Sequence, residues 1–296
     1  MSTPDEILQA CASQPLETVL SLLSTCPNPP QAREMASQAV RHDRLPLLQH
    51  ILANTPRESL EPTGMLLLDA ASGRSPACVQ AMLDTGLSIN LNDDRTGGVL
   101  HRALGGVGCP ESFIAWLLER GAAVNHPGDY DPDGFNPDQV HCMCNGVSHG
   151  TVPILRLLVA AGAHVDGSRA LHYAAWCDRL EAARFLVEEC GAAVDAPAGV
   201  RGWYWRGDVG STPLHVAVAG NSVRVAEYLL EKGADLEAKN AAGRTPLQDA
   251  GYFLGIETAG TKRMDLPWDL RFLAGGYEGG HQEIVNFLKQ RESQPA

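Results

Sequence analysis

The sequence predicts an all-α solenoid, a stack of short helix pairs that repeat a pattern of about thirty-three residues. The clearest copy, residues 210–237, has two apolar helix faces separated by a turn that contains Gly and Asn. Thr212 is placed to cap the first helix, which begins at Pro213, and Gly233 is placed to end the second. One such pair cannot bury both of its apolar faces, so the pairs must stack on one another.

Further copies of the pattern cover nearly the whole chain. Two degenerate helix pairs, at residues 4–25 and 31–52, precede the regular copies and bring the expected total to seven or eight repeats. One copy carries a single extra residue before its closing Gly191. Five further copies are recognised by an apolar helix segment and, in four of them, by the glycine that ends the second helix. They are Leu67 to Ala71 with Gly86, Leu100 with Gly121, Leu157 with Gly162, Leu171 to Ala175 with Gly191, and Thr245 to Leu247 with a second helix over 280–288.

The string Thr-Pro-Leu-His at residues 212–215, with Leu229, Leu230 and Gly233 further on, closely resembles the signature of the ankyrin repeat. The resemblance implies an ankyrin-repeat solenoid in which each connector forms a β-hairpin finger beside the first helices. It also implies a recognition module whose concave face binds a partner, generally another protein. The histidine of each Leu-His pair is implied to hydrogen-bond the neighbouring connector, and these histidines are His101, His172 and His215.

The repeats are expected to form a single ankyrin-repeat domain over residues 1–296. Within it, we expect degenerate N-terminal capping repeats over 1–60 and regular repeats over 61–250. Residues 251–296 are expected to form an interrupted C-terminal capping repeat, because an apolar insertion separates its two helices.

Composition excludes several classes of protein. The 296 residues carry a formal net charge of −12, which argues against nucleic acid and anionic membranes as partners. No apolar run approaches the roughly 18 residues of a membrane span, and the first residues do not resemble a secretion signal. The eight cysteines form no CxxC pair and are expected to be reduced. We therefore expect a monomeric protein of the cytoplasm or the nucleus.

The connectors depart most from the regular pattern. The ordinary connector places Thr245 8 positions after Glu237, whereas Thr212 follows Asp195 by 17 positions. The connectors at 126–136 and 196–211 are therefore long, and between them lies the shortest, at 166–169. Two long fingers on either side of a short one predict a notch.

The notch is expected to have an aromatic lining. The family pattern directs three positions of each first helix toward the concave face, and here these are Tyr173, Trp176 and Cys177 in one repeat. In the other repeat they are expected to be Asn145, Ser148 and His149, although the register leaves open whether His141 or His149 faces the notch. An exposed aromatic cluster usually marks a binding site, and the alternative is that these side chains pack under a loop. The residues expected on the fingers are Tyr130, Trp203, Tyr204, Trp205, Arg206 and Asp208.

Two functions fit these residues. In the first, a protein segment is anchored in the notch by the aromatic side chains, and Arg206 and the acidic connector add specificity. In the alternative, the notch binds a small molecule or acts as a metal-free acid–base enzyme of the cyclase or isomerase type. The candidate catalytic residues of that alternative are His149, Asp208, Tyr173 and Asp129.

Two segments contain metal-ligand residue types but are not expected to bind metal. Residues 129–134 spell the opening of a calcium loop, yet Val140 stands where the loop needs its bidentate glutamate. Cys142 and Cys144 point about 200° apart on a helix, so both thiolates cannot reach one ion. The sequence therefore predicts neither a metal site nor a cofactor.

Overall fold

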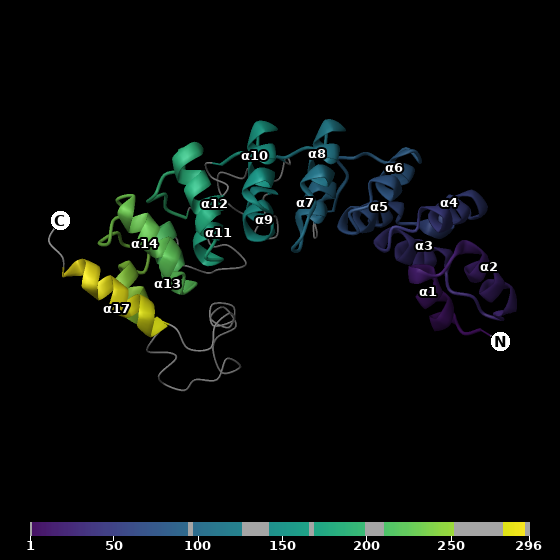
Figure 1. Ribbon diagram of the computed structural model, residues 1–296, viewed down its shortest axis with the longest axis horizontal. Coiled ribbons are helices and arrows are strands. Elements are labelled where there is room, and N and C mark those ends of the chain that lie inside the picture. The colour runs from purple at the N-terminus through teal and green to yellow at the C-terminus, as the bar shows by residue number, and fades with distance from the viewer. Residues whose placement is uncertain are drawn as a thin grey trace. The chain divides into compact units, whose positions relative to one another are not determined.

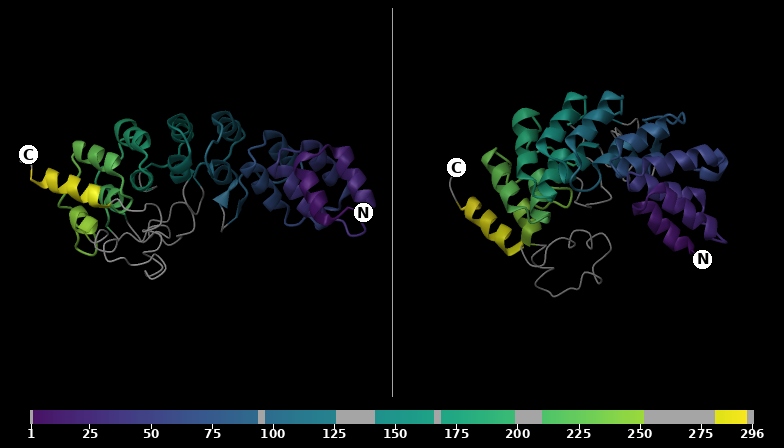
Figure 2. Two further views of the ribbon diagram at one scale, coloured as in Figure 1. Left: turned by 60° about the horizontal axis from the view of Figure 1, so that its bottom comes forward. Right: turned by 45° about the vertical axis from the view of Figure 1, so that its right-hand side comes forward.

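The computed structural model describes residues 2–93, 97–125, 142–165, 169–198, 210–251 and 281–293. The chain divides into two compact units, Met1–Val124 and Asn125–Ala296. Within each unit, short helices follow one another in pairs, as Figures 1 and 2 show. No helix in these ranges is long and apolar enough to cross a membrane.

The described part of the first unit contains four helix pairs and a short hairpin. Its elements are α1 (Pro4–Ser13), α2 (Leu16–Thr25), α3 (Ala32–Arg41), α4 (Leu45–Asn54), η1 (Arg57–Leu60), α5 (Thr63–Ser72), α6 (Pro76–Leu83), β1 (Asn92–Asp93), β2 (Gly97–Gly98), α7 (Val99–Leu104) and α8 (Glu111–Glu119). The first helices of the pairs, α1, α3, α5 and α7, contact one another in that order and form a first-helix layer. The connector before α7 is an antiparallel hairpin with Asn92 opposite Gly98, which is the finger form expected of this fold.

The second unit continues the same arrangement. Its elements are α9 (Cys142–His149), α10 (Val152–Ala160), α11 (Ala170–Trp176), α12 (Leu180–Arg184), η2 (Phe185–Glu189), α13 (Pro213–Ala219), α14 (Val223–Glu231), a helix over 246–251 and α17 (His281–Glu292). The first-helix layer here consists of α9, α11 and α13, and α17 packs against α14. The described residues thus hold seven helix pairs, and 246–251 with α17 supply the helices of an eighth, in agreement with the expected seven or eight repeats.

The extra residue before Gly191 is absorbed at the end of the second helix. There α12 passes directly into η2, a π-helical turn in which Cys190 N donates to Phe185 O over 3.2 Å. A π-helical turn holds about one residue more than an α-helical turn, so Gly191 still ends the helix, with a φ of 74°. Phe185 and Leu186 therefore stay buried on the apolar face despite the insertion.

One polar side chain in several repeats fixes the connector of the next repeat. In the second unit, Asn125 Nδ2 donates to Gly162 O over 2.7 Å, and His164 N donates to Asn125 Oδ1 over 3.0 Å. Because an asparagine offers both a donor and an acceptor, one residue satisfies two backbone groups of its neighbour. The same role belongs to Asn90, toward Gly121 and Ala123 in the first unit. Asp195 in the second unit has no donor and only accepts, from Asp235 N over 3.0 Å.

The apolar faces predicted from the periodicity form the core. In the pair of α13 and α14, Leu214, Ala217 and Val225 are fully buried. Leu229 is 0% exposed, as expected from its place between helices. Removal of this apolar surface from water is the main favourable contribution to the stability of the stack.

We expect Leu229→Ala to lower the free energy of unfolding by roughly 2–5 kcal/mol, because it removes buried methyl groups and leaves a cavity. Urea unfolding measures the change. The neighbouring Leu230→Ala is the matched control and should cost less, because Leu230 is only half-buried. A loss below about 1 kcal/mol for Leu229→Ala would show that the repeat register is wrong.

Candidate functional site

The side chains expected to form the floor of the notch lie on two adjacent helices of the first-helix layer. We call them the α9–α11 surface, and they are Asn145, Ser148 and His149 on α9, Tyr173 and Trp176 on α11, and Cys177 directly after it. The helices α9 and α11 contact each other. Cys177 Sγ donates to Ser148 Oγ over 3.9 Å, so the two groups of residues meet at this point.

Two aromatic side chains stand on one face of α11. Tyr173 and Trp176 are half-buried, whereas Ala174 and Ala175 between them are buried against the core. Residues three positions apart in a helix are neighbours on its surface, so both rings are within reach of the same ligand segment. The helix thus presents a partly exposed aromatic pair on a rigid support.

The face of α9 is more polar. Met143, Cys144 and Val147 are buried, as the apolar pattern predicted, and Ser148 and His149 are half-buried beside them. His149 is the last residue of α9. His141 lies outside the described residues, so the choice between the two histidines stays a prediction.

His172 connects α11 to the base of the long connector 196–211. Its Nε2 donates to Ser211 O over 3.2 Å, and Ala198 N donates to the same oxygen over 2.9 Å. A second backbone bond joins Gly210 N to Ala198 O over 2.8 Å, so the connector leaves the layer from a paired base. Burial of His172 lowers the pKa of its imidazole from 6.5 to about 4, which keeps the ring neutral at physiological pH.

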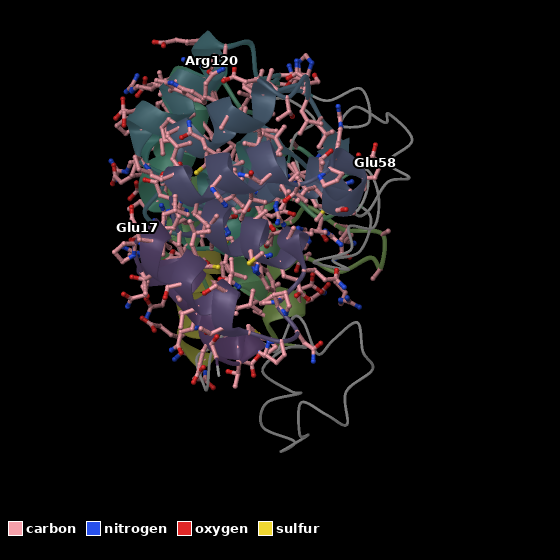
Figure 3. All side chains as sticks on the ribbon, turned by 90° about the vertical axis from the view of Figure 1, so that its right-hand side faces the viewer. Glu17, Glu58 and Arg120 are labelled. Carbon is pink, nitrogen blue, oxygen red and sulfur yellow. The ribbon has the colours of Figure 1, made fainter. Side chains whose placement is uncertain are left out.

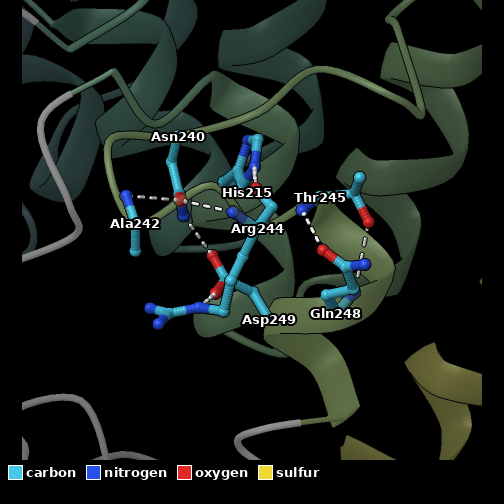
Figure 4. A network of polar contacts seen from close by, with 7 residues as sticks. All are labelled: His215, Asn240, Ala242, Arg244, Thr245, Gln248 and Asp249. Carbon is cyan, nitrogen blue, oxygen red and sulfur yellow. Dashed lines mark hydrogen bonds and ion pairs between the residues drawn. The ribbon is translucent and has the colours of Figure 1, made fainter.

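The ordinary connector at 237–245 is tied down in the same way (Figure 4). Thr212 N donates to His215 Nδ1 over 3.2 Å, so the opposite nitrogen carries the proton, and Nε2 donates to Arg244 O over 2.9 Å. Asn240 Nδ2 donates to Asp249 Oδ2 over 2.8 Å, and Arg244 forms an ion pair with the same buried carboxylate. The expected bond from the Leu-His histidine to the neighbouring connector is confirmed at His172 and His215.

The residues expected on the two long fingers lie outside the described residues. They are Asp129, Tyr130, Trp203, Tyr204, Trp205, Arg206 and Asp208. The notch as a whole therefore stays a prediction, and so does the alternative acid–base site, for which the structure places His149 and Tyr173 but not the two aspartates.

A pocket of about 460 Å³ lies at the helix turns of the second unit. It is lined by the turns after α9 and α11, by residues of α10 and α12, and by Arg224 of α14. The charged groups that line it make contacts between repeats. Arg179 Nη2 donates to Gly150 O over 2.6 Å, and Arg224 pairs with Asp178 over 2.7 Å. The pocket is thus part of the stacking of the turns and is not the notch.

A charged cluster on the first-helix layer of the first unit was missed by the sequence reasoning. Asp69 on α5 accepts from Ser37 Oγ over 2.9 Å, from Arg41 Nη2 over 3.1 Å and from Arg102 Nη2 over 3.4 Å. Its side chain is 9% exposed. The sequence did contain a signal for this cluster. Asp69 and Arg102 occupy the repeat position of Tyr173, which is expected to face away from the core.

Comparisons with known proteins agree with the fold. The sequence model of the family described as Ankyrin repeat matches residues 166–198 and 209–241. The crystal structure of the human ASB11 ankyrin repeat domain superposes with a TM-score of 0.58 at 22% identity, over 88% of this chain and 99% of that one.

Two curated relatives match parts of the chain. The "BRCA1-associated RING domain protein 1" of Caenorhabditis elegans is 36% identical over 107 residues, which is 35% of this chain. The "Nuclear factor NF-kappa-B p105 subunit" of Mus musculus is 31% identical over 192 residues, or 61% of this chain. The matched regions make up 14% and 18% of the lengths of these two relatives.

Acid should weaken the second unit through His172. The folded-state pKa of about 4 is below the unfolded value of 6.5, so the unfolded chain binds more protons between these pH values. Stability from this group is complete above pH 6.5 and is lost as pH falls toward 4, by roughly 2–3 kcal/mol at pH 4.5. Urea unfolding at several pH values should show that His172→Gln removes this part of the dependence. His42→Gln, at an exposed histidine, should keep it, and equal effects of both variants would contradict the assignment.

Proposed function

Because the chain belongs to the ankyrin-repeat family, we propose that its α9–α11 surface binds a segment of another protein between the connectors 126–136 and 196–211. Ankyrin-repeat domains generally mediate protein–protein interaction. The observation that carries the proposal is the pairing of Tyr173 and Trp176 on the helix whose His172 holds the base of the connector 196–211.

The chemistry of this surface suits a polypeptide. Tyr and Trp are over-represented among the residues that dominate binding energy, because they bury a large area at a small cost in conformational entropy. Asn145, Ser148 and His149 beside them offer polar groups at the edge of the aromatic pair. A segment that covers both rings would also meet these polar groups, which gives the surface an apolar centre and a polar rim.

The aromatic and charged residues of the connectors are the further partners in this proposal. Trp203, Tyr204 and Trp205 would cover the bound segment from one side, and Arg206 would pair with an acidic residue of it. A net charge of −12 argues against nucleic acid as the ligand, and we expect the chain to act in the cytoplasm or the nucleus.

Trp176→Ala should weaken binding of the segment by about 2 kcal/mol or more, which is about thirtyfold in affinity. Peptides selected on the wild-type chain from a random library provide the probe, and fluorescence anisotropy provides the affinity. Trp116→Ala is the matched control, because Trp116 is a half-buried tryptophan on α8, in a second helix of the first unit. Selected peptides that bind Trp176→Ala and the wild-type chain equally well would exclude this surface.

Replacement of residues 200–207 by a short turn should abolish binding and preserve the fold. The backbone bonds between Ala198 and Gly210 and from Ala198 to Ser211 stay in place, and a shorter loop costs less closure entropy. Circular dichroism and the melting temperature report on the fold, and the same peptide titration reports on function. Full binding by the shortened chain, or its unfolding, would contradict the role of this connector.

A further inference from the structure

In the first-helix layer of the first unit, two positively charged groups surround the single negative charge of Asp69. Ser37 and Arg41 alone give Asp69 three hydrogen bonds, one from the hydroxyl and two from Arg41 Nη2, over 2.9 to 3.1 Å. Arg102 Nη2 adds a fourth at 3.4 Å. Two guanidinium groups therefore share one carboxylate, and the cluster keeps one unit of positive charge.

Arg102 is the group with spare bonding capacity. Its side chain is 26% exposed, and the hydrogen bond that it makes to Asp69, from Nη2, is 3.4 Å long. A guanidinium presents five N–H donors in a fixed plane and cannot lose its charge. The Arg102 guanidinium is partly removed from water, and its bond to the shared carboxylate is long. A second acceptor would therefore lower its free energy.

Arg41 lies near Arg102, because both guanidinium groups bond to Oδ1 of Asp69. Its side chain is 54% exposed, and its two hydrogen bonds to Asp69 both come from Nη2. The helices α3, α5 and α7 that carry Arg41, Asp69 and Arg102 contact one another in that order, so Asp69 holds the two guanidinium groups on either side of α5. A carboxylate that contacts both guanidinium groups would replace water bound to them. Because Asp69 already holds these groups in place, little conformational entropy would be lost on binding.

We propose that Arg41 and Arg102 form a site for an acidic side chain of a protein partner, with Asp69 as the positioning residue. The inference rests on the proposed function, since it takes the first-helix layer to be the protein-binding face. The partner is a segment rich in Asp or Glu, because carboxylates match the planar fork of a guanidinium. The rest of the chain is acidic, so such a segment is attracted to this cluster and repelled elsewhere.

A fluorescein-labelled peptide of eight glutamates is the probe, titrated into the full chain at low salt and followed by fluorescence anisotropy. We expect saturable binding that weakens with added salt, because part of the attraction is between solvent-exposed charges. Arg102→Gln and Arg41→Gln should each weaken it about tenfold or more, as loss of a charge-assisted bond implies. The corresponding peptide of eight lysines should not bind at this cluster.

The matched control is Arg120→Gln, which removes the same charge at the end of a second helix, outside the cluster. Arg120 is exposed at the end of α8, where it stacks on Trp116 with 3.7 Å to the ring centroid, and Figure 3 shows it at the surface with Glu17 and Glu58. It should leave octaglutamate binding unchanged. Arg102→Lys, which keeps the charge and loses the fork, should bind more weakly than the wild-type chain. Melting temperatures establish that each variant is folded.

Several results would overturn the proposal. These are no octaglutamate binding to the wild-type chain, equal losses for Arg102→Gln and Arg120→Gln, or tighter binding of a phosphoserine peptide than of octaglutamate. Trp176→Ala keeps this test separate from that of the proposed function, since it lies in the other unit and should not change octaglutamate binding. Either proposal can therefore fail while the other stands.

Discussion

Burial of apolar helix faces between neighbouring pairs is the interaction on which this structure depends. A pair such as α13 and α14 has too little area to bury Leu214, Val225 and Leu229 by itself, so each pair uses the next one as its core. The end of the second helix can then vary, as the π-helical turn at Phe185–Glu189 shows, because the buried face is preserved. Stability is therefore local to neighbouring repeats.

Hydrogen bonds from side chains to the backbone decide where the connectors leave the stack. Asn125, His172 and His215 each bond to backbone groups in the connector of the following repeat. With its base held in this way, a connector such as 196–211 can be lengthened without disturbing the helices. Recognition residues can thus be placed on connectors and on the outward face of the first helices, both of which are free of the packing constraint.

The helix pairs were predictable from the sequence because their apolar periodicity, caps and closing glycines are local signals. The roles of His172 and His215 came from the Leu-His position in the repeat, and the structure confirms them. The long connectors have no periodicity, so sequence could indicate their length and composition but not their conformation. The Asp69 cluster joins residues of three different repeats, and its existence depends on distances between helices that no single repeat specifies.

The two proposed recognition surfaces use one position of the repeat for different chemistry. The residue after the Leu-His histidine is Tyr173 in one repeat, and the equivalent positions are Asp69 and Arg102 in the first unit. This position points away from the core, so an aromatic ring, a carboxylate or a guanidinium is accommodated there without loss of apolar burial. A charged residue that is buried at this position still needs partners, which is why Asp69 lies between Arg41 and Arg102. The two cations outnumber this carboxylate, and we propose that an anionic group from outside the chain binds to them.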